Sequence, residues 1–314
     1  MCDEEDTAGA FCARVRAVLG DVPFELIVVD DGSRDRTAGI VAGLAAIDPR
    51  VKLLRLSRNW GHQTALTAGL DRASGDAVVC LDGDLQDPPE VIGELLERWR
   101  AGADVVYAVR RSRAGESRFK LSSARWFYRT LGRLSDTPVQ ADAGDFRLLD
   151  RRALDAVLAM RERNRYLRGM TVWVGYDQAS VAYDREARTA GSTKYTVRRM
   201  LRFSFDAITS FSHAPLQVAT LLGFCFAGIA FLGMPVAIGL RIGGLFVPGI
   251  ASVLLAVLLL GGIQLIAVGL IGEYVSRIYD EVKARPLYLV AEEINLEPRD
   301  ALPEPEDPRI GAIP

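Results

Sequence analysis

Short apolar runs alternate with helical patterns along the first third of the chain. The apolar runs predict strands at residues 25–29, 51–56, 77–81 and 105–109. The helical patterns lie between or after them, at residues 37–47, 64–73 and 89–101. Strands that alternate with helices are typical of parallel βαβ units, and continuously apolar strands are typical of a sheet covered on both faces. We therefore predict an α/β domain with a Rossmann-like sheet over residues 1–195.

The C-terminal part of the chain contains two long runs without a charged residue, at 214–240 and 242–272, separated by Arg241. Roughly 20 apolar residues cross the hydrocarbon core of a bilayer, so each run is long enough to do so. A buried helical hairpin in a soluble core is the alternative, but soluble helices seldom extend this far without a charge. We predict two transmembrane helices over residues 214–272.

Basic residues flank both ends of this segment. They are Lys194, Arg198, Arg199 and Arg202 before it, and Arg277, Lys283 and Arg285 after it. By the positive-inside rule, both ends and the N-terminal domain lie in the cytoplasm. Residues 196–213 predict a juxtamembrane amphipathic helix, with an ordinary surface helix as the alternative, and residues 273–290 predict a second one. Residues 291–314, rich in Pro and Glu, predict a disordered tail.

Composition excludes several classes of site. A net charge of −2 and a pI of about 5.9 argue against nucleic-acid binding. The four cysteines form no C-x-x-C pair, which argues against a zinc cluster and a disulfide scaffold. No G-x-G-x-x-G motif follows a predicted strand, so a dinucleotide fingerprint is absent. Because the chain has two histidines, a catalytic metal would be held mainly by oxygen atoms.

Acidic residues stand where two of the predicted strands end. Asp30 and Asp31 follow one strand, and Asp82 and Asp84 follow another. Ligands of such sheets bind at the carboxyl ends of the strands. Two residues apart in extended backbone, Asp82 and Asp84 would point the same way, and Gln86 continues the spacing. This pattern suits Mg²⁺ or Mn²⁺ clamping a diphosphate, with a solvated turn as the alternative.

Three ordered motifs are more specific than this spacing. They are Val-Val-Asp-Asp-Gly-Ser at 28–33, Ser-Arg-Asn-Trp-Gly-His-Gln at 57–63 and Leu-Asp-Gly-Asp-Leu-Gln-Asp-Pro-Pro at 81–89. The chain resembles the family 2 glycosyltransferases that charge polyprenyl phosphate, among them dolichyl-phosphate mannose synthases and, as the nearest branch, bactoprenol glucosyltransferases. The resemblance extends over residues 3–290 through further matching segments at 142–149, 163–169, 190–195, 271–274 and 285–288.

The resemblance implies a GT-A fold and an inverting, metal-dependent transfer of a sugar, most often glucose, from a UDP-sugar. The implied acceptor is a polyprenyl phosphate, such as undecaprenyl or decaprenyl phosphate. The implied location is the cytoplasmic face of the bacterial inner membrane, with the chain as a multi-pass protein. Members of this family tend to assemble as homo-oligomers, commonly tetramers.

The resemblance also assigns roles to individual residues. It implies nucleotide-sugar binding by Glu4, Asp30, Asp31, Arg58 and Asp82. It implies metal and diphosphate binding by Asp82, Asp84 and Gln86, and lipid-phosphate binding by Arg188, Lys194 and Tyr195. It places Asp145 and Arg147 at the reacting centre. Asp145 could orient an arginine, bind sugar hydroxyls or act as a base, and Arg147 would neutralise the incoming phosphate.

One departure from the family pattern concerns the N-terminus. Family members begin with an apolar strand, whereas this sequence starts at the acidic turn that follows it. We therefore expect the natural protein to start upstream of Met1. Two other functions stay open. A processive polysaccharide synthase would carry a Gln-x-x-Arg-Trp motif and more membrane helices, and a catalytically silent membrane scaffold or regulatory subunit would lack the acidic set.

Overall fold

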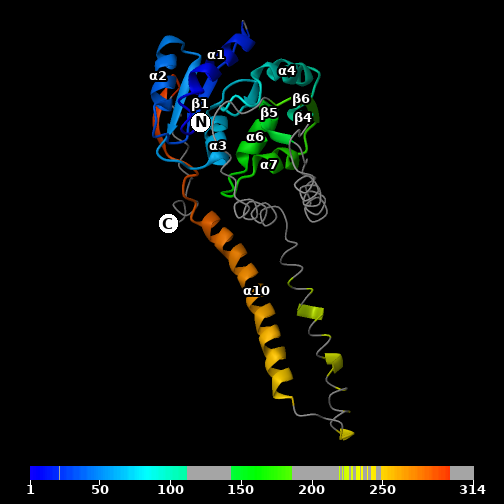
Figure 1. Cartoon of the computed structure of the whole chain (residues 1–314). Coiled ribbons are helices and arrows are strands. Elements are labelled where there is room, and N and C mark those ends of the chain that lie inside the picture. The colour runs from blue at the N-terminus through cyan, green and yellow to red at the C-terminus, as the bar shows by residue number, and fades with distance from the viewer. Residues whose placement is uncertain are drawn as a thin grey trace, which may run out of the picture.

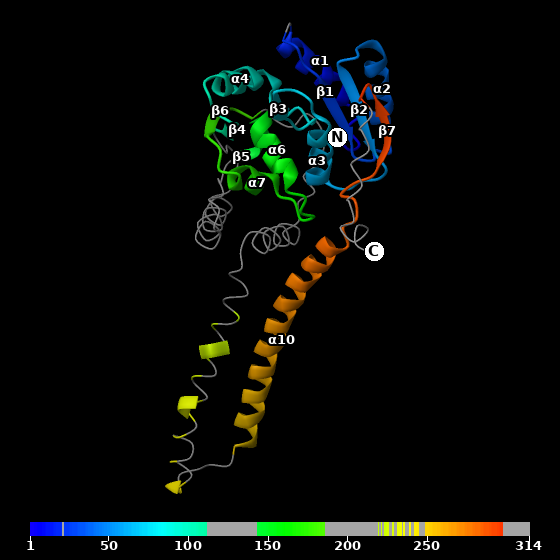
Figure 2. The ribbon, with the colours of Figure 1, turned by 180° about the vertical axis from the view of Figure 1, so that it is seen from behind.

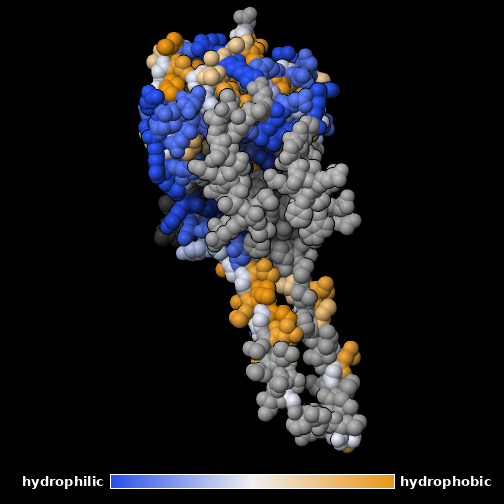
Figure 3. All heavy atoms as spheres, in the orientation of Figure 1, coloured by the Kyte–Doolittle hydropathy of each residue, from blue (hydrophilic) through white to orange (hydrophobic). Residues whose placement is uncertain are grey.

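The computed structural model describes residues 1–20, 22–111, 143–185 and 249–297, and individual positions between 219 and 244. An α/β domain occupies one end of the molecule, and one long helix extends away from it (Figures 1 and 2). The surface of the domain is largely hydrophilic, whereas the coloured part of the extension is largely hydrophobic (Figure 3). The molecule therefore separates a polar domain from an apolar stalk.

The first of two sheets contains three strands in the order β1-β2-β7. They are β1 (Leu26–Asp30), β2 (Val51–Leu56) and β7 (Val290–Ile294). β1 and β2 are parallel, and β7 is antiparallel to β2. The apolar side chains of this sheet form a core with α1 (Ala8–Leu19) and α2 (Thr37–Ile47). A further cluster joins β2 to α3 (His62–Arg72).

The second sheet contains four strands in the order β3-β5-β4-β6. They are β3 (Ala77–Cys80), β4 (Val105–Arg110), β5 (Ala143–Asp150) and β6 (Gln178–Tyr183). β5 is antiparallel to both of its neighbours, and β6 is parallel to β4. The helices packed against this sheet are α4 (Ile92–Arg100), which follows the short helix η1 (Pro89–Val91), α6 (Arg151–Ala159) and α7 (Leu167–Trp173).

The predicted α/β class is confirmed, but the arrangement of strands is mixed rather than parallel. The four predicted strands and the helices between them are present, with β2 and α2 at the predicted residues. The pattern of the sequence did not predict α1, α6, α7 or the later strands β5, β6 and β7. Antiparallel neighbours such as β3 and β5 need no crossover helix between them. The alternation of strands and helices along the sequence therefore does not predict the later strands.

The stalk is α10 (Ile250–Val282), a continuous helix of 33 residues. Within the described part of the chain, one helical segment, Leu259–Val282, is long and apolar enough to cross a membrane. The structure thus describes one such helix instead of the predicted pair. Most of the other predicted span and the whole predicted amphipathic helix at 196–213 lie outside the described residues. The separate helix predicted over 273–290 is not found, because α10 continues to Val282 and the chain beyond it is not helical.

The prediction of disorder from residue 291 onward is wrong over 291–297, because β7 completes the edge of the first sheet there. Asn295 fixes the end of β7 by donating hydrogen bonds to the carbonyl oxygens of Ala45 and Val51, at 2.7 and 2.9 Å. Before β7, the hydroxyl of Tyr288 donates to Asp71 on α3 at 2.8 Å. These hydrogen bonds attach residues 288–295 to the domain, although the Pro- and Glu-rich composition of the C-terminal segment suggested a disordered tail.

Candidate active site

A group of polar side chains meets at one end of the domain. It consists of His62 and Gln63 from the first turn of α3, Asp145 from β5 and Arg168 from α7, and we call it the Asp145 cluster. The chain enters α3 through Gly61, whose φ of 94° is a conformation that suits glycine. The cluster therefore joins one helix of the first half of the domain to a strand and a helix of the second.

Asp145 is buried and accepts hydrogen bonds from three side chains. Arg168 donates twice, from Nε to Oδ1 at 2.8 Å and from Nη2 to Oδ2 at 2.9 Å. His62 Nε2 lies 2.9 Å from Oδ2, and Gln63 Nε2 lies 3.4 Å from the same oxygen. Gln63 also accepts a hydrogen bond from the backbone N–H of Leu167 at 2.9 Å. Both carboxylate oxygens of Asp145 are thus occupied by groups of the protein.

These contacts determine the charge of the cluster. Burial acts to raise the pKa of Asp145, but the hydrogen bonds from His62 and Arg168 outweigh it and hold that pKa well below its usual range. The hydrogen bond to Asp145 raises the pKa of His62, although burial opposes it. Asp145 is consequently a carboxylate at neutral pH. Among the three roles that the sequence left open, this arrangement favours the orientation of an arginine.

Arg147 lies beneath the site, not on its surface. It is 4% exposed, and its guanidinium donates to the carbonyl of Gly144 at 2.7 Å and to the hydroxyl of Thr171. Burial lowers the pKa of Arg147. The expectation that Arg147 faces an incoming phosphate is not met here. The guanidinium that reaches the surface beside Asp145 belongs to Arg168, whose side chain is 32% exposed.

Asp82 and Asp84 follow β3 in a turn. The chain turns at Gly83 and Asp84, so the two carboxylates do not share the extended backbone that we expected. Asp84 Oδ1 accepts the backbone N–H of Gln86 at 3.1 Å, which closes the turn. Asp82 borders the Asp145 cluster, with Oδ1 3.7 Å from Nε2 of His62. Burial raises the pKa of Asp82, and the nearby carboxylates of Asp145 and Asp84 add to the rise.

The carboxylates of this turn are the oxygen donors that Mg²⁺ and Mn²⁺ prefer. In the described ranges, no group of three His, Cys, Asp or Glu side chains is arranged to hold a metal ion. Asp82 and Asp84 would therefore need further oxygen ligands, such as those of a diphosphate. Burial is the main cause of the raised pKa of Asp82, and a cation would offset the part of the rise that the carboxylates of Asp145 and Asp84 add. The donor set fits a cation shared between protein and nucleotide.

Asp30 and Asp31, at the end of β1, are buried and shape the adjacent loops. Asp31 accepts the backbone N–H groups of Trp60 and Gly61 at 2.7 and 3.0 Å, and Asp30 accepts that of Ser33 at 3.2 Å. The carboxylate of Asp31 thus holds the 57–61 loop against the end of the strand, and that of Asp30 holds the turn that follows β1. This contact network shows a structural role for both residues.

Of the remaining predicted residues, Arg58 lies in the same 57–61 loop, Glu4 lies near the N-terminus, and three lie outside the described ranges. Arg58 stacks on the ring of Trp60 at 3.6 Å from the ring centroid. Glu4 accepts the hydroxyl of Thr7 at 3.1 Å, and its backbone N–H donates to Thr37 at 2.9 Å. The predicted lipid-phosphate residues lie outside the described ranges: Arg188, Lys194 and Tyr195.

Sequence reasoning did not single out His62, Gln63 or Arg168 as site residues. A signal existed, because they lie in the segments 57–63 and 163–169 that carry the family resemblance. Their mutual contacts join residues about 100 positions apart, such as Gln63 and Leu167. Spacing along the chain contains no information about such contacts.

The known proteins that are similar to this chain are glycosyltransferases. Residues 1–158 match the family model "Glycosyl transferase family 2". The chain is 47% identical over 278 residues to the uncharacterized glycosyltransferase YkcC of Bacillus subtilis, covering 87% of this chain and 85% of that protein. It is 42% identical over 291 residues to the SfII prophage-derived bactoprenol glucosyl transferase of Shigella flexneri, covering 92% of this chain and 94% of that protein.

One of the solved structures that the comparison finds is the mannosyl-3-phosphoglycerate synthase of Rubrobacter xylanophilus. Its sequence identity to this chain is 17% and the TM-score is 0.44, over 79% of this chain and 74% of that one.

The contact between Gly32 and the 57–61 loop leads to a first prediction. Gly32 has φ 70°, and a Cβ atom there would lie 2.4 Å from the carbonyl carbon of Arg58 and 2.6 Å from the backbone nitrogen of Asn59. We expect Gly32→Ala to displace the loop and lower the free energy of unfolding by about 2 kcal/mol or more. Gly39→Ala in α2 is the control, because nothing lies within 4 Å of its added Cβ. Thermal unfolding in detergent should separate the two variants, and equal stability would contradict the prediction.

The Asp145 cluster leads to a second prediction. Asp145→Asn, Arg168→Gln and the double variant form a double-mutant cycle, and we expect a coupling free energy of about 1–3 kcal/mol because the pair is largely buried. The exposed pair of Arg14 and Glu90, with a bond of 2.7 Å, is the control and should couple by less than about 1 kcal/mol. Denaturant unfolding in detergent measures both cycles. Similar coupling in the two cycles would show that Asp145 does not bind Arg168 more strongly than a surface pair does.

Proposed function

The chain belongs to glycosyltransferase family 2, and from this membership we propose that it transfers a sugar from a UDP-sugar to a polyprenyl phosphate. Glucose is the proposed sugar, and the product is a lipid-linked sugar donor. One observation carries the proposal: the chain is 42% identical over 92% of its length to a protein named bactoprenol glucosyl transferase. The alignment includes the C-terminal part of the chain as well as the α/β domain.

The chemistry of the acceptor suits the Asp145 cluster. The second pKa of a phosphomonoester is about 6, so the acceptor is largely a dianion at pH 7 and needs little help from a base. Asp145 is poorly suited to act as a base, because both of its oxygens accept hydrogen bonds and its pKa is low. The two observations agree, since the acceptor does not need a base. We propose that Asp145 is a positioning residue that holds Arg168 toward the reacting groups. A single displacement would invert the anomeric carbon of the donor.

Repulsion between phosphate groups is the main electrostatic obstacle to this reaction. Two unit charges 4 Å apart repel by about 4 kcal/mol at an effective dielectric constant of 20. We propose that Arg168 partly neutralises the incoming phosphate, and that Lys194, Arg188 and Tyr195 contribute to its binding as the resemblance implies. Asp82 and Asp84, with Gln86 in the same turn, would hold Mg²⁺ or Mn²⁺, which stabilises a departing diphosphate when bound.

The donor pocket lies, in this proposal, between the loops at the ends of β1 and β3. Asp31 shapes the 57–61 loop and Asp30 the turn after β1, and the stacked side chain of Arg58 belongs to that loop. Glu4, at the start of the chain, borders the same region through its contact with Thr37. The GT-A form of the fold is proposed on the same family membership.

The apolar stalk would anchor the domain to the membrane. We propose that α10 inserts in the bilayer and that the α/β domain lies on the cytoplasmic face, where the phosphate of the carrier lipid is found. Glu281, near the end of α10, accepts the backbone N–H of Arg163 at 2.7 Å, which connects the stalk to the domain. This attachment would hold the site at the surface of the bilayer. A second membrane span and a homotetramer stay predictions.

A transfer assay is the third prediction and tests the proposed function directly. Membranes that contain the protein, incubated with labelled UDP-glucose, Mn²⁺ and undecaprenyl phosphate, should form an acid-labile labelled lipid. A panel of other UDP-sugars and GDP-mannose is the control for donor specificity. A long labelled polymer would indicate a processive synthase instead, and no product with any donor would indicate a silent scaffold.

The acidic turn leads to the fourth prediction. Asp82→Ala and Asp84→Ala should each lower the rate of transfer at least about 100-fold, because they remove charge that would hold the cation on the leaving diphosphate. Asp76→Ala, an exposed carboxylate before β3, is the matched control and should keep its activity. EDTA should abolish transfer by the unchanged protein, and Mn²⁺ or Mg²⁺ should restore it. Full activity of both turn variants would exclude the proposed metal role.

A further inference from the structure

The segment from Asp82 to Gln86, which we call the acidic turn, has a strained backbone. Leu85 within it has a φ of 58°, a left-handed conformation that residues with a Cβ atom rarely adopt. Inside the turn, the N–H of Gln86 donates to Asp84 at 3.1 Å. A residue stays in such a conformation where the surrounding structure holds it there. The acidic turn therefore depends on contacts with the rest of the domain.

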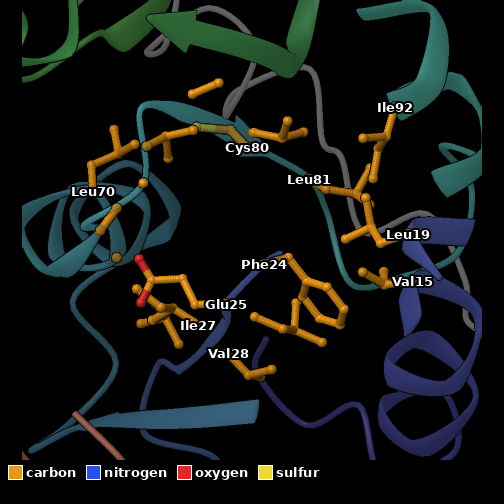
Figure 4. A pocket seen from close by; sticks show the side chains of 18 of the residues that line it. Val15, Leu19, Phe24, Glu25, Ile27, Val28, Leu70, Cys80, Leu81 and Ile92 are labelled. Atoms are coloured by element: carbon orange, nitrogen blue, oxygen red, sulfur yellow. The ribbon is translucent and has the colours of Figure 1, made fainter. Parts of the chain in front are cut away.

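The start of the acidic turn borders a cavity of about 400 Å³ between the two sheets. Cys80 and Leu81, which lead into the turn, lie along the wall of this cavity (Figure 4). Asp82 and Gly83 also line it. Side chains beside an unfilled space have fewer packing contacts than those of a close-packed interior. Packing at this end therefore constrains the turn less than a filled core would.

The other end of the acidic turn is followed by Asp87, which is 1% exposed. Its Oδ1 accepts hydrogen bonds from the hydroxyl of Tyr183 at 2.6 Å and from Nε of Arg185 at 3.1 Å. Nη2 of Arg110 lies 3.9 Å from the same oxygen, and Nε of Arg110 donates to the hydroxyl of Tyr183 at 3.3 Å. Because Arg110 ends β4 and Tyr183 ends β6, Asp87 joins the turn to the carboxyl ends of two parallel strands.

Tyr183, the main partner of Asp87, is itself held firmly. It is buried, and its ring packs edge-to-face on Phe146 of β5, with 5.8 Å between the ring centroids. Phe146 directly follows Asp145, so this contact also leads to the strand that carries the Asp145 cluster. Leu85, by contrast, packs against the core of the first sheet. The turn and the residue after it are thus attached to both halves of the domain.

The bonds of Asp87 are of the strong kind. The carboxylate lies beneath the side chains of Arg110 and Arg185, which are 32% and 30% exposed, and it is itself shielded from water. Hydrogen bonds between charged groups are stronger than neutral ones, and a low local dielectric strengthens them further. Asp87 belongs to the motif at 81–89, yet the resemblance and the proposed metal site assign it no role.

From this geometry we propose that Asp87 is a positioning residue, which fastens the acidic turn to β4 and β6 and so sets the placement of the cation ligands in that turn. The inference rests on the proposed function, in which the turn holds a cation on the diphosphate of the donor. Mg²⁺ demands near-ideal geometry of its oxygen ligands. A turn that is fixed before binding also avoids the ordering cost that a loose turn would add.

Amide hydrogen exchange and Mn²⁺ binding test this role on the full chain in detergent. Asp87→Asn keeps the size of the side chain but removes its charge, and Tyr183→Phe removes one hydrogen bond and keeps the ring. We expect the amide of Gln86 to exchange at least about tenfold faster in Asp87→Asn, and to a smaller extent faster in Tyr183→Phe. The dissociation constant of Mn²⁺ in the presence of UDP, measured by electron paramagnetic resonance, should rise at least about tenfold in Asp87→Asn.

Asp104→Asn is the matched control. Asp104 is also a nearly buried carboxylate, at 8% exposed, and it accepts a hydrogen bond from Arg152 at 2.7 Å. It lies at the opposite end of β4, immediately before Val105. We expect Asp104→Asn to lower the thermal stability, as Asp87→Asn does, and to leave both the exchange of Gln86 and the binding of Mn²⁺ unchanged.

Two results would overturn the proposal. One is equal exchange of Gln86 in Asp87→Asn and Asp104→Asn, and the other is faster exchange in Asp87→Asn with unchanged affinity for Mn²⁺. If Asp87→Asn does not fold, the same comparison with Tyr183→Phe decides between the outcomes. Failure of the unchanged protein to bind Mn²⁺ with UDP would instead contradict the proposed function, and it is distinguishable because it appears before any substitution.

Discussion

The two halves of the α/β domain are held together by side chains, because no backbone ladder joins the described strands of one sheet to those of the other. The Asp145 cluster is one of these links. Asp145 and Arg168 belong to the second half, and His62 and Gln63 open the helix that packs on the first sheet. Because burial alone would disfavour a carboxylate there, the hydrogen bonds from His62 and Arg168 are a condition for the ionised form of Asp145. Position and charge at the candidate site therefore depend on the same few bonds.

Local patterns in the sequence were sufficient for the strands β1 to β4 and the helices between them. The apolar run of β2 and the helical pattern of α2 coincide with the observed elements, since both are specified by neighbouring residues. The later strands were missed because their partners are distant. β7 consists of Val290–Ile294, has exposed glutamates and has no apolar periodicity that would distinguish it from a tail. Its pairing with β2 and the hydrogen bonds of Asn295 are contacts between residues more than 230 positions apart.

The candidate site was predictable in its residue types and less so in its geometry. The acidic residues at the ends of β1 and β3 were recognised, but the turn at Gly83 altered the expected direction of Asp82 and Asp84. Arg147 and Arg168 both lie in motif segments, and the sequence analysis singled out Arg147. The structure buries Arg147, which belongs to β5, and leaves Arg168 partly exposed. Which arginine reaches solvent is decided by the packing of α7 on β5, and the spacing of charges along the chain does not reveal that packing.

The C-terminal strand has a consequence for biosynthesis. β2 ends at Leu56, whereas its antiparallel partner begins at Val290, after the whole of α10. At translation rates of about 5–20 residues per second, the time between the synthesis of β2 and that of β7 is on the order of tens of seconds. The outer edge of β2 has no partner during this time. The whole of α10 must therefore be synthesised before the first sheet can be completed. Completion of the domain becomes a late event that follows synthesis of this helix, and a nascent chain stalled before residue 290 would expose an unpaired strand edge.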